Sequence, residues 1–364
     1  MSEKIRVAIL FGGKSGEHLV SIQSASSVIE AIDTNEYDIV PICIDSRGHW
    51  LSIEQSIPLL NESTSNKLRL VSSNQSTISV EEKDQSSLLP SVAPSLASAN
   101  IDVVFPVLHG TYGEDGTIQG LLEMANVPYV GAGVLSSAVG MDKVFTKRVF
   151  DQMELPQGNY LSYLRSQWDH EANEVLVEIE SRFSYPVFVK PSNSGSSVGI
   201  SKAKNQDELI EAIHLACQYD RKFLVEENIK GREIEVAILG NEDPIASVPG
   251  EIVSSNDFYD YRAKYVDGKS AMVIPAELPS EHSELIRELA IKAYKAIDAS
   301  GLARVDFFYT EEGRILINEI NTMPGFTKYS MYANLWAGTG LTYSQLVEKL
   351  IRLALERYED KQRT

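Results

Sequence analysis

The chain has few cysteines, no long apolar run and an excess of acidic residues. Cys43 and Cys217 are its only cysteines among 364 residues, which excludes a disulfide framework and a thiolate metal cluster. No stretch approaches the roughly 18 apolar residues that a membrane-spanning helix needs. The first apolar run, residues 5–11, contains Arg6 and is too short for a signal peptide. We therefore expect a cytoplasmic protein without a membrane partner.

The charge balance limits the class of partner. Lys and Arg number 33 against 51 Asp and Glu, so the formal net charge is −18. This acidity predicts no nucleic-acid partner, although a small nucleotide would need only local positive charge. The apolar share of 43% and charged share of 23% are those of a globular protein. At about 150 residues per domain, the length predicts two or three domains.

The first third of the chain alternates short apolar strands with helical patterns, which predicts a parallel sheet covered by helices. Strands are expected at residues 5–11, 37–44, 102–108 and 127–130, and helices at 21–32 and 118–124. Two glycine-rich loops follow strands, where such sheets bind ligands. Residues 52–100 are rich in Ser, Asn and Gln and are expected to form an irregular or hairpin-bearing insertion.

After about residue 145 the pattern predicts antiparallel hairpins and helices, an α+β arrangement. The expected hairpins pair 187–190 with 198–201, 223–226 with 233–239, and 302–309 with 314–320. Further helices are expected near 206–219 and 281–299. The last helix should begin at Thr342, with Gln345 completing a capping box, and its tail from Glu356 should fray.

The last hairpin carries the strongest chemical signal. If residues 312–313 form a two-residue turn, Asp306 faces Glu319 and Arg304 faces Asn321, all on one face. Facing carboxylates repel each other, and a divalent cation between them would reverse that effect. Carboxylate and amide oxygens suit Mg²⁺, and Arg304 could hold an anion beside it.

A solvated hairpin face is the simpler alternative. The same register places Phe308, Ile315 and Ile317 on the acidic face, which predicts that this face is at least partly buried. A buried charged group without a function would be costly, so we favour a metal and anion site. A one-residue slip in register would separate the group.

Two other segments could bind a nucleotide. Lys190 ends an apolar strand, and its ammonium group and the N–H groups of the following loop could hold phosphate. The small residues of that loop are Ser192, Ser194, Gly195, Ser196 and Ser197. The loop does not match the Walker pattern, and a plain hairpin turn would look the same. Glu226 could accept the adenine amine and Glu233 the ribose hydroxyls, although each could also be an exposed charge.

Seven motifs together resemble the D-alanine–D-alanine ligases, a branch of the ATP-grasp enzymes. They are GGKSGEHLVS, LHGTYGEDGTIQG, VGMDK, VFVKPSNSGSSVGISK, FYDYRAKY, LARVDFF and INEINTMPGFT, in the family's order. The resemblance runs from about Ile5 to Leu353 and implies a Rossmann-like parallel-sheet domain followed by a two-part ATP-grasp fold. It divides the chain into residues 1–145, a central subdomain 146–240 and a C-terminal subdomain 241–364 with a lid loop at 251–274.

The resemblance implies an ATP site and a metal site. Asp306, Glu319 and Asn321 would hold two Mg²⁺ or Mn²⁺ ions, with Glu319 bridging both. The residues that it assigns to ATP are Lys143, Lys190, Ser197, Glu226, Glu227, Ile229, Glu233, Lys264 and Asn318. Lys264 would reach the terminal phosphate when the lid loop closes.

It also implies sites for two D-alanine molecules. Glu17 would bind the ammonium group of the first, supported by Ser196 and Tyr265, with His109 and Gly110 near its carboxylate. Arg304 and the N–H of Gly325 would stabilise the oxyanion, and Ser330 and Met331 would hold the second substrate's carboxylate. The implied activity is ATP-dependent formation of D-alanyl-D-alanine through D-alanyl phosphate, for peptidoglycan precursors, and the family resemblance also suggests a homodimer.

Three alternatives stay open. A D-alanine–D-lactate or D-alanine–D-serine ligase is the nearest, although Tyr265 in FYDYRAKY is typical of the dipeptide-forming members. A regulator that binds nucleotide without chemistry is suggested only by Leu19, where family members often have an acid. An oxidoreductase is disfavoured because GGKSGE does not match G-x-G-x-x-G.

Overall fold

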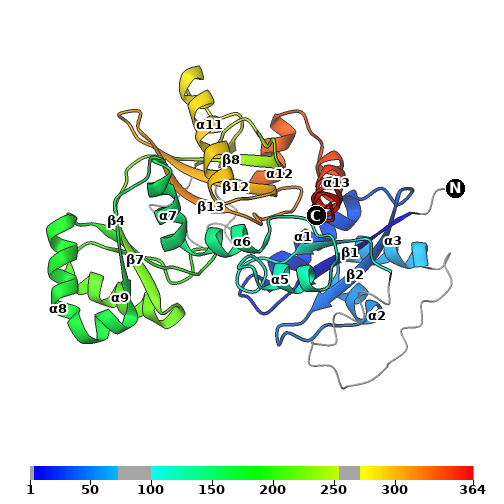
Figure 1. The fold of residues 1–364 in the computed structure, drawn as a ribbon, viewed down its shortest axis with the longest axis horizontal. Helices are drawn as coiled ribbons and strands as arrows, with labels where there is room; N and C mark the ends of the chain where they lie inside the picture. Colours follow the sequence, from blue (N-terminus) through cyan, green and yellow to red (C-terminus); the bar gives the residue numbers. More distant parts are fainter. Residues whose placement is uncertain (1–3, 73–99, 254–270, 364) are drawn as a thin grey trace.

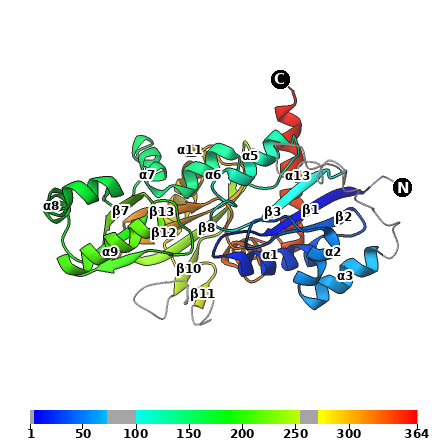
Figure 2. The same ribbon diagram turned by 90° about the horizontal axis from the view of Figure 1, so that it is seen from below.

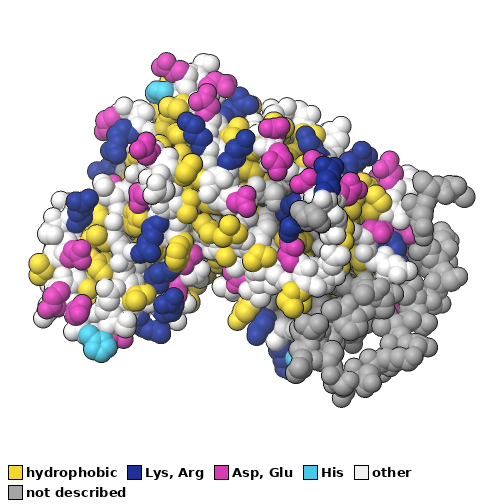
Figure 3. All heavy atoms as spheres, in the orientation of Figure 1, with side chains coloured by type: hydrophobic (Ala, Val, Ile, Leu, Met, Phe, Trp, Pro, Cys, Tyr) yellow, Lys and Arg dark blue, Asp and Glu magenta, His cyan; other side chains and the backbone are white. Residues whose placement is uncertain are grey.

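The structure is a computed structural model that describes residues 4–72, 100–253 and 271–363. Its strands form three sheets spread along the molecule (Figure 1). A three-stranded N-terminal sheet lies at one end, a four-stranded sheet at the other, and a six-stranded sheet between them. Among the described helices, none combines the length and apolar character that a bilayer crossing requires. Acidic and basic side chains are mixed over the face drawn in Figure 3.

The N-terminal sheet is parallel, as the sequence predicts. Its order is β2 (Tyr37–Ile44), β1 (Ile5–Gly12), β3 (Val103–Val107), and α1 (His18–Ala31) and α5 (Thr117–Met124) follow β1 and β3. Residues 127–130 do not form the predicted strand and contribute a bridge between Tyr129 and Val104. The carboxyl ends of β1 and β3 therefore lie side by side and present both glycine-rich loops at one edge.

The described part of the Ser-rich insertion is helical, so the prediction of irregular or hairpin structure is wrong there. It contains α2 (Ile53–Ser56), the 3₁₀ helix η1 (Ile57–Leu59) and α3 (Glu62–Ser72), whereas residues 73–99 lie outside the described residues. Leu60 and Leu68 are buried in the core beside α1. Buried hydroxyl groups, such as Ser65 Oγ donating to the Ile57 carbonyl at 2.8 Å, explain the polar composition.

The four-stranded sheet is antiparallel and carries helices on one face. Its order is β4 (Tyr160–Leu164), β7 (Lys222–Glu227), β5 (Val187–Pro191), β6 (Ser201–Ala203), with α8 (Arg165–Arg182) and α9 (Gln206–Tyr219) packed on it. The predicted pairing after Lys190 is confirmed, but the return strand starts at Ser201. The loop between the two strands is therefore longer than a hairpin turn.

The predicted hairpin of residues 223–226 with 233–239 is wrong. Both edges of β7 are occupied by β4 and β5, so the chain crosses to the six-stranded sheet. That sheet contains β8 (Arg232–Gly240), β9 (Ile245–Ala246), β10 (Gly250–Val253), β11 (Ala271–Val273), β12 (Gly301–Tyr309) and β13 (Ile315–Asn321). Figure 2 shows β10 and β11 extending away from the rest of this sheet.

The two faces of the six-stranded sheet have different uses. Odd-numbered residues of β12 pack in a core with α11 (Ser280–Ala296), whereas even-numbered ones face the other way. The remaining helices in the described residues are α6 (Val134–Met141), α7 (Lys143–Gln152), α12 (Met331–Gly338) and α13 (Tyr343–Lys361). Thr342 and Gln345 form the predicted capping box of α13.

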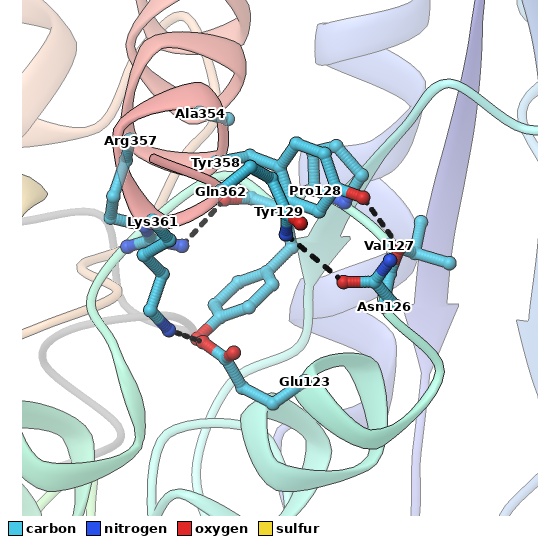
Figure 4. A pocket seen from close by; sticks show the side chains of 10 residues that line it. All are labelled: Glu123, Asn126, Val127, Pro128, Tyr129, Ala354, Arg357, Tyr358, Lys361 and Gln362. Carbon is cyan, nitrogen blue, oxygen red and sulfur yellow. Dashed lines mark hydrogen bonds and ion pairs between the residues drawn. The ribbon is translucent and has the colours of Figure 1, made fainter. Parts of the chain in front are cut away.

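The tail of α13 remains helical to Lys361, which contradicts the prediction that it frays. Figure 4 shows a small cavity of about 30 Å³ where α13 meets residues 126–129. Arg357 lies over the Tyr129 ring at 4.4 Å, and Lys361 contacts Glu123 at 2.7 Å. These contacts tie the end of the chain to the N-terminal domain.

Candidate active site

The hairpin of β12 and β13 places the predicted acids together. Asp306 pairs directly with Glu319, and Arg304 with Asn321, as predicted. The predicted two-residue turn is wrong, because Thr310 and Arg314 close a three-residue turn in which Gly313 has a φ of +79°. A β-bulge after Asp306 compensates for the extra turn residue. The extra turn residue and the bulge thus offset each other, so Asp306 still faces Glu319.

The bulge also changes which side chains share the acidic face. Ile317 pairs with Phe307 and Ile315 with Tyr309, so both isoleucines lie in the opposite core, contrary to prediction. Phe308 does lie on the acidic side and lines its cavity. Bulges often redirect a side chain beside a functional site, and here the extra residue is Asn318.

Arg304 is the centre of the acidic cluster. Its Nε and Nη2 atoms each donate to a different oxygen of Asp306 at 2.7 Å, and Nε also lies 2.9 Å from Glu235 Oε2. Burial disfavours the charged guanidinium, but Asp306 and Glu235 outweigh burial and raise the pKa of Arg304 well above its ordinary value. Asn321 Nδ2 donates to Asp306 Oδ2 at 3.0 Å.

A second charged cluster lies across the cavity on β5, β7 and α7. Glu226 contacts Lys147 at 2.7 Å through Oε1 and Lys190 at 2.5 Å through Oε2. Burial alone would raise the pKa of Glu226, but the two lysines lower it to about 2. Lys190 also approaches Asn318 Oδ1 at 3.4 Å, which links this cluster to the bulge.

A cavity of about 310 Å³ separates these two clusters. We call it the nucleotide cavity, because it is lined by most of the residues predicted to bind ATP. These are Lys190, Ser197, Glu226, Glu227, Ile229, Glu233 and Asn318, and the predicted metal ligand Glu319 lines it too. Glu227 differs in that its side chain accepts bonds from the N–H and side-chain amide of Asn159 at 2.7 and 2.9 Å. Lys264 and Tyr265 lie outside the described residues.

The loop after β5 connects the nucleotide cavity with the N-terminal domain. Ser196 and Ser197 have φ angles of +47° and +59°, a left-handed conformation that is uncommon outside glycine. Ser196 Oγ donates to Glu17 Oε1, while Lys143 Nζ donates to the Ser194 carbonyl at 2.7 Å and lies 3.9 Å from Glu319. This loop therefore brings the predicted phosphate and first-substrate residues together.

The glycine-rich loop after β3 supplies a buried histidine. His109 Nε2 lies 3.0 Å from Ser24 Oγ, and Nδ1 lies 3.1 Å from the Met323 carbonyl and 3.6 Å from Glu114. Burial favours the neutral imidazole, but Glu114 raises the pKa of His109 above its ordinary value. Gly110 is close to Glu17, since a Cβ there would lie 2.8 Å from its carboxylate.

A larger cavity of about 880 Å³ joins these groups to the acidic cluster. The residues that line it include many of those predicted to bind substrate or metal, namely Glu17, His109, Ser196, Arg304, Glu319, Asn321, Gly325, Ser330 and Met331. Ser330 immediately precedes α12, so its surroundings include the N-terminus of that helix. Glu319 lines both the larger cavity and the nucleotide cavity.

The comparisons with known proteins agree with this arrangement. The family models described as D-ala D-ala ligase N-terminus and C-terminus match residues 6–132 and 149–352. The chain belongs to the D-alanine–D-alanine ligase family. The resemblance predicted from the motifs is confirmed.

Individual relatives of the ligase family cover nearly the whole chain. A D-alanine–D-alanine ligase of Bacillus licheniformis is 50% identical over 360 residues, covering 99% of this chain and 98% of that protein. One from Ruminiclostridium cellulolyticum is 52% identical, covering 100% and 98%.

Solved structures of the family share the fold. A D-alanine–D-alanine ligase from Coxiella burnetii has a TM-score of 0.81 at 37% identity, covering 100% of this chain and 97% of that one. A D-Ala:D-Ser ligase from Enterococcus faecalis has a TM-score of 0.78 at 37% identity, covering 97% and 100%. The predicted Rossmann-like sheet followed by an ATP-grasp fold is thereby confirmed.

The donor set fits the metal ions that this ligase family implies. Asp306, Glu319 and Asn321 offer hard oxygen atoms, and Asn321 turns its amide nitrogen toward Asp306, which leaves its oxygen available. Within residues 4–72, 100–253 and 271–363, no three acidic, histidine or cysteine side chains could hold a metal by themselves. Ligands from phosphate and water would therefore have to complete the coordination.

Three residues of the site were missed by sequence reasoning. Glu235 on β8 and Lys147 on α7 reach the clusters from strands and helices distant in sequence. Glu114 could have been found, because it lies in the same glycine-rich loop as His109. In the structure it accepts the Gly110 N–H at 3.0 Å. Leu19, at the position of the missing acid, is 71% exposed, whereas Glu17 is buried.

Proposed function

We propose that this chain ligates two D-alanine molecules to D-alanyl-D-alanine at the expense of ATP, for peptidoglycan precursors. The observation that supports this most is that Glu319 lines both cavities, so that one carboxylate serves the nucleotide and the amino-acid sides. Arg304 lies beside it in the larger cavity.

Nucleotide binding would use both charged clusters. Lys143, Lys190 and Lys264 would contact the phosphates, with Glu226 and Glu233 at the adenine and ribose. Asp306, Glu319 and Asn321 would hold two Mg²⁺ or Mn²⁺ ions, which supply charge neutralisation for in-line phosphoryl transfer. Lys190 would then have to exchange Glu226 for a phosphate, a change that its position beside Asn318 allows.

Activation of the first substrate comes next. Glu17 would bind its ammonium group, with Ser196 holding the Glu17 carboxylate in place. His109 would lie near the substrate carboxylate, with Glu114 raising its pKa above the ordinary value. A carboxylate oxygen then attacks the terminal phosphorus, ADP leaves, and D-alanyl phosphate forms.

The second step forms the peptide bond. The neutral amine of the second D-alanine attacks the acyl carbon, phosphate leaves, and the amine loses a proton. Arg304 and the Gly325 N–H would stabilise the tetrahedral oxyanion, a contribution of roughly 3–4 kcal/mol per donor. Ser330 and Met331 at the start of α12 would hold the second carboxylate, which the helix N-terminus favours.

Relatives near 50% identity named D-alanine–D-alanine ligase favour D-alanine over D-lactate or D-serine as second substrate. The decisive experiment combines purified protein, Mg²⁺, ATP and D-alanine, and measures phosphate release and the product mass. We expect D-alanyl-D-alanine and one phosphate per dipeptide, and no release with L-alanine. Absence of phosphate release above background would contradict the proposal. With D-lactate or D-serine also present, an ester or a mixed dipeptide as main product would instead indicate a D-alanine–D-lactate or D-alanine–D-serine ligase.

The division of the chain into three parts is also a proposal. The boundary near residue 145 falls at the start of α7, in keeping with the sheets. Because β8 pairs within the six-stranded sheet, a second boundary between β7 and β8 suits the sheets better than one after residue 240. We further propose a cytoplasmic location, where ATP is available, and a homodimer.

A further inference from the structure

Glu235 is a buried carboxylate to which the proposed reaction assigns no role. It lies on β8, is 6% exposed, and pairs directly with Asp306, which in turn pairs with Glu319. Three carboxylates thus stand in a row across three neighbouring strands. Glu235 also lines both cavities. A buried acid in this place needs a reason, because burying a charge is costly unless it is paired.

One partner of Glu235, the Arg304 guanidinium, is shared with Asp306. Arg304 Nε carries one hydrogen atom and lies 2.7 Å from Asp306 Oδ1 and 2.9 Å from Glu235 Oε2. The hydrogen bond goes to Asp306, which also accepts from Nη2 at 2.7 Å. Both oxygens of Asp306 are therefore engaged by the guanidinium in this state.

That arrangement competes with the metal site. A carboxylate oxygen can accept a hydrogen bond while it ligates a cation, but a cation on Asp306 neutralises that carboxylate and repels the nearby guanidinium. The pairing of Arg304 with Asp306 would then weaken inside a buried site. Glu235 Oε2 is already within hydrogen-bond distance of Nε, so a small reorientation of the planar guanidinium group would suffice.

We propose that Glu235 is a positioning residue that takes over the Nε–H of Arg304 when nucleotide and metal occupy Asp306 and Glu319. The guanidinium then stays aimed at the acyl carbon through its remaining N–H groups. The inference rests on the proposed function, since it assumes the metal site and the oxyanion role of Arg304. It assigns to Glu235 no contact with either substrate.

Kinetics provide the first test. Glu235→Met, which removes both charge and acceptor, should lower kcat on the order of 10- to 100-fold, as loss of outer-shell support does. The KM for ATP should stay within about threefold, because the adenine and phosphate contacts remain. Glu235→Gln keeps a neutral acceptor and should recover part of kcat. Glu178→Gln is the control, since Glu178 accepts a bond from Tyr163 at 3.0 Å in the four-stranded sheet.

NMR of isotopically labelled arginine provides a second test that needs no turnover. The Arg304 Nε–H, assigned with Arg304→Lys, should exchange slowly with solvent in the wild type with and without Mg–ADP. In Glu235→Met it should exchange slowly without ligand and roughly tenfold faster or more with Mg–ADP, as expected for losing a charged hydrogen bond. The same series can be run on Glu235→Gln if the Met variant does not fold.

Several results would overturn the proposal. One is unchanged Arg304 exchange in Glu235→Met with Mg–ADP, even if the protein is an active ligase. Another is weaker Mg²⁺ binding with Arg304 still protected, which would make Glu235 a metal ligand instead. Failure of the proposed function is recognised separately, because the wild type would then form no dipeptide.

Discussion

Two charged clusters face each other across the nucleotide cavity and are built in opposite ways. At one, the Glu226 carboxylate lies between the ammonium groups of Lys147 and Lys190, at 2.7 and 2.5 Å. At the other, the Arg304 guanidinium lies between Asp306 and Glu235. In each cluster one outer group is expected to move to the ligand, namely Lys190 to phosphate and Asp306 to metal. The other outer group remains to neutralise the central charge.

A buried charge with two partners can exchange one of them at a low cost in free energy. Removing one partner of a buried ion pair typically destabilises a protein by about 3–5 kcal/mol, because a charge is left uncompensated. A second partner already in contact avoids that penalty during ligand binding. Lys147 and Glu235 would therefore have the same role in clusters of opposite sign, because each stays to neutralise the central charge.

The largest effect is expected from removing the centre of the acidic cluster. Arg304→Gln should lower kcat on the order of 100- to 1000-fold, because an oxyanion donor is lost. ADP affinity should stay within about threefold, since Arg304 does not line the nucleotide cavity. Phosphate-release kinetics and calorimetric ADP titration measure the two quantities. An equal loss in both would mean that Arg304 serves nucleotide binding instead.

The two lysines of the basic cluster should have separable effects. Lys147→Met should raise the KM for ATP roughly tenfold with kcat little changed, because Glu226 loses the partner that stays with it. Lys190→Met should mainly lower kcat, because a phosphate contact is lost in the transition state. Steady-state kinetics of both variants at varied ATP decide this. A lower kcat in Lys147→Met and a higher KM for ATP in Lys190→Met would contradict the proposed equivalence of Lys147 and Glu235.

Acid stability measures how firmly the lysines hold Glu226. The folded-state pKa of about 2 lies below the ordinary 4.5, so the ionised carboxylate stabilises the folded state fully above pH 4.5. That contribution, about 3 kcal/mol, is lost as pH falls from about 4.5 towards 2. Denaturant unfolding should give a difference between wild type and Glu226→Gln that is constant from about pH 7 to 5. A difference that already shrinks between pH 7 and 5 would contradict the proposal that the two lysines hold Glu226 in its ionised form.

The smallest effect is expected at His109, which lines the larger cavity on the side proposed for the amino-acid substrate. Its raised pKa means that protonated His109 stabilises the fold below the ordinary 6.5, and that this contribution is lost as pH rises through the folded-state pKa. Glu114→Gln should lower the pKa of His109 and move that loss to lower pH. NMR titration of the imidazole checks the shift, and an unchanged pKa would show that Glu114 is not its cause.

Sequence reasoning succeeded where pairing is local. The strands of residues 5–11 and 37–44 and the facing pair of Asp306 and Glu319 follow from apolar runs and from hairpin geometry. Even there, the turn length and the bulge were missed, and the register at the acids was right because the two errors cancel. The bulged register places Ile315 and Ile317 in the core with α11, a contact that periodicity does not report.

Contacts between distant segments could not be predicted. The pairing of Glu235 with Asp306 joins β8 to β12, and this required knowing that β7 has no free edge. The helices at residues 53–72 were hidden because their serine hydroxyls satisfy backbone groups inside the fold. Family resemblance supplied roles for individual residues, but not Glu235 or Lys147.

The most direct test of the account is a crystal structure of the protein with ADP, Mg²⁺ and a phosphorylated D-alanine analogue. We expect Mg²⁺ at about 2.0–2.1 Å from oxygens of Asp306, Glu319 and Asn321. We also expect that Lys190 contacts phosphate while Lys147 stays on Glu226, and that Arg304 has turned from Asp306 to Glu235. Metal bound elsewhere, with Arg304 still on both oxygens of Asp306 and Lys190 still on Glu226, would contradict it.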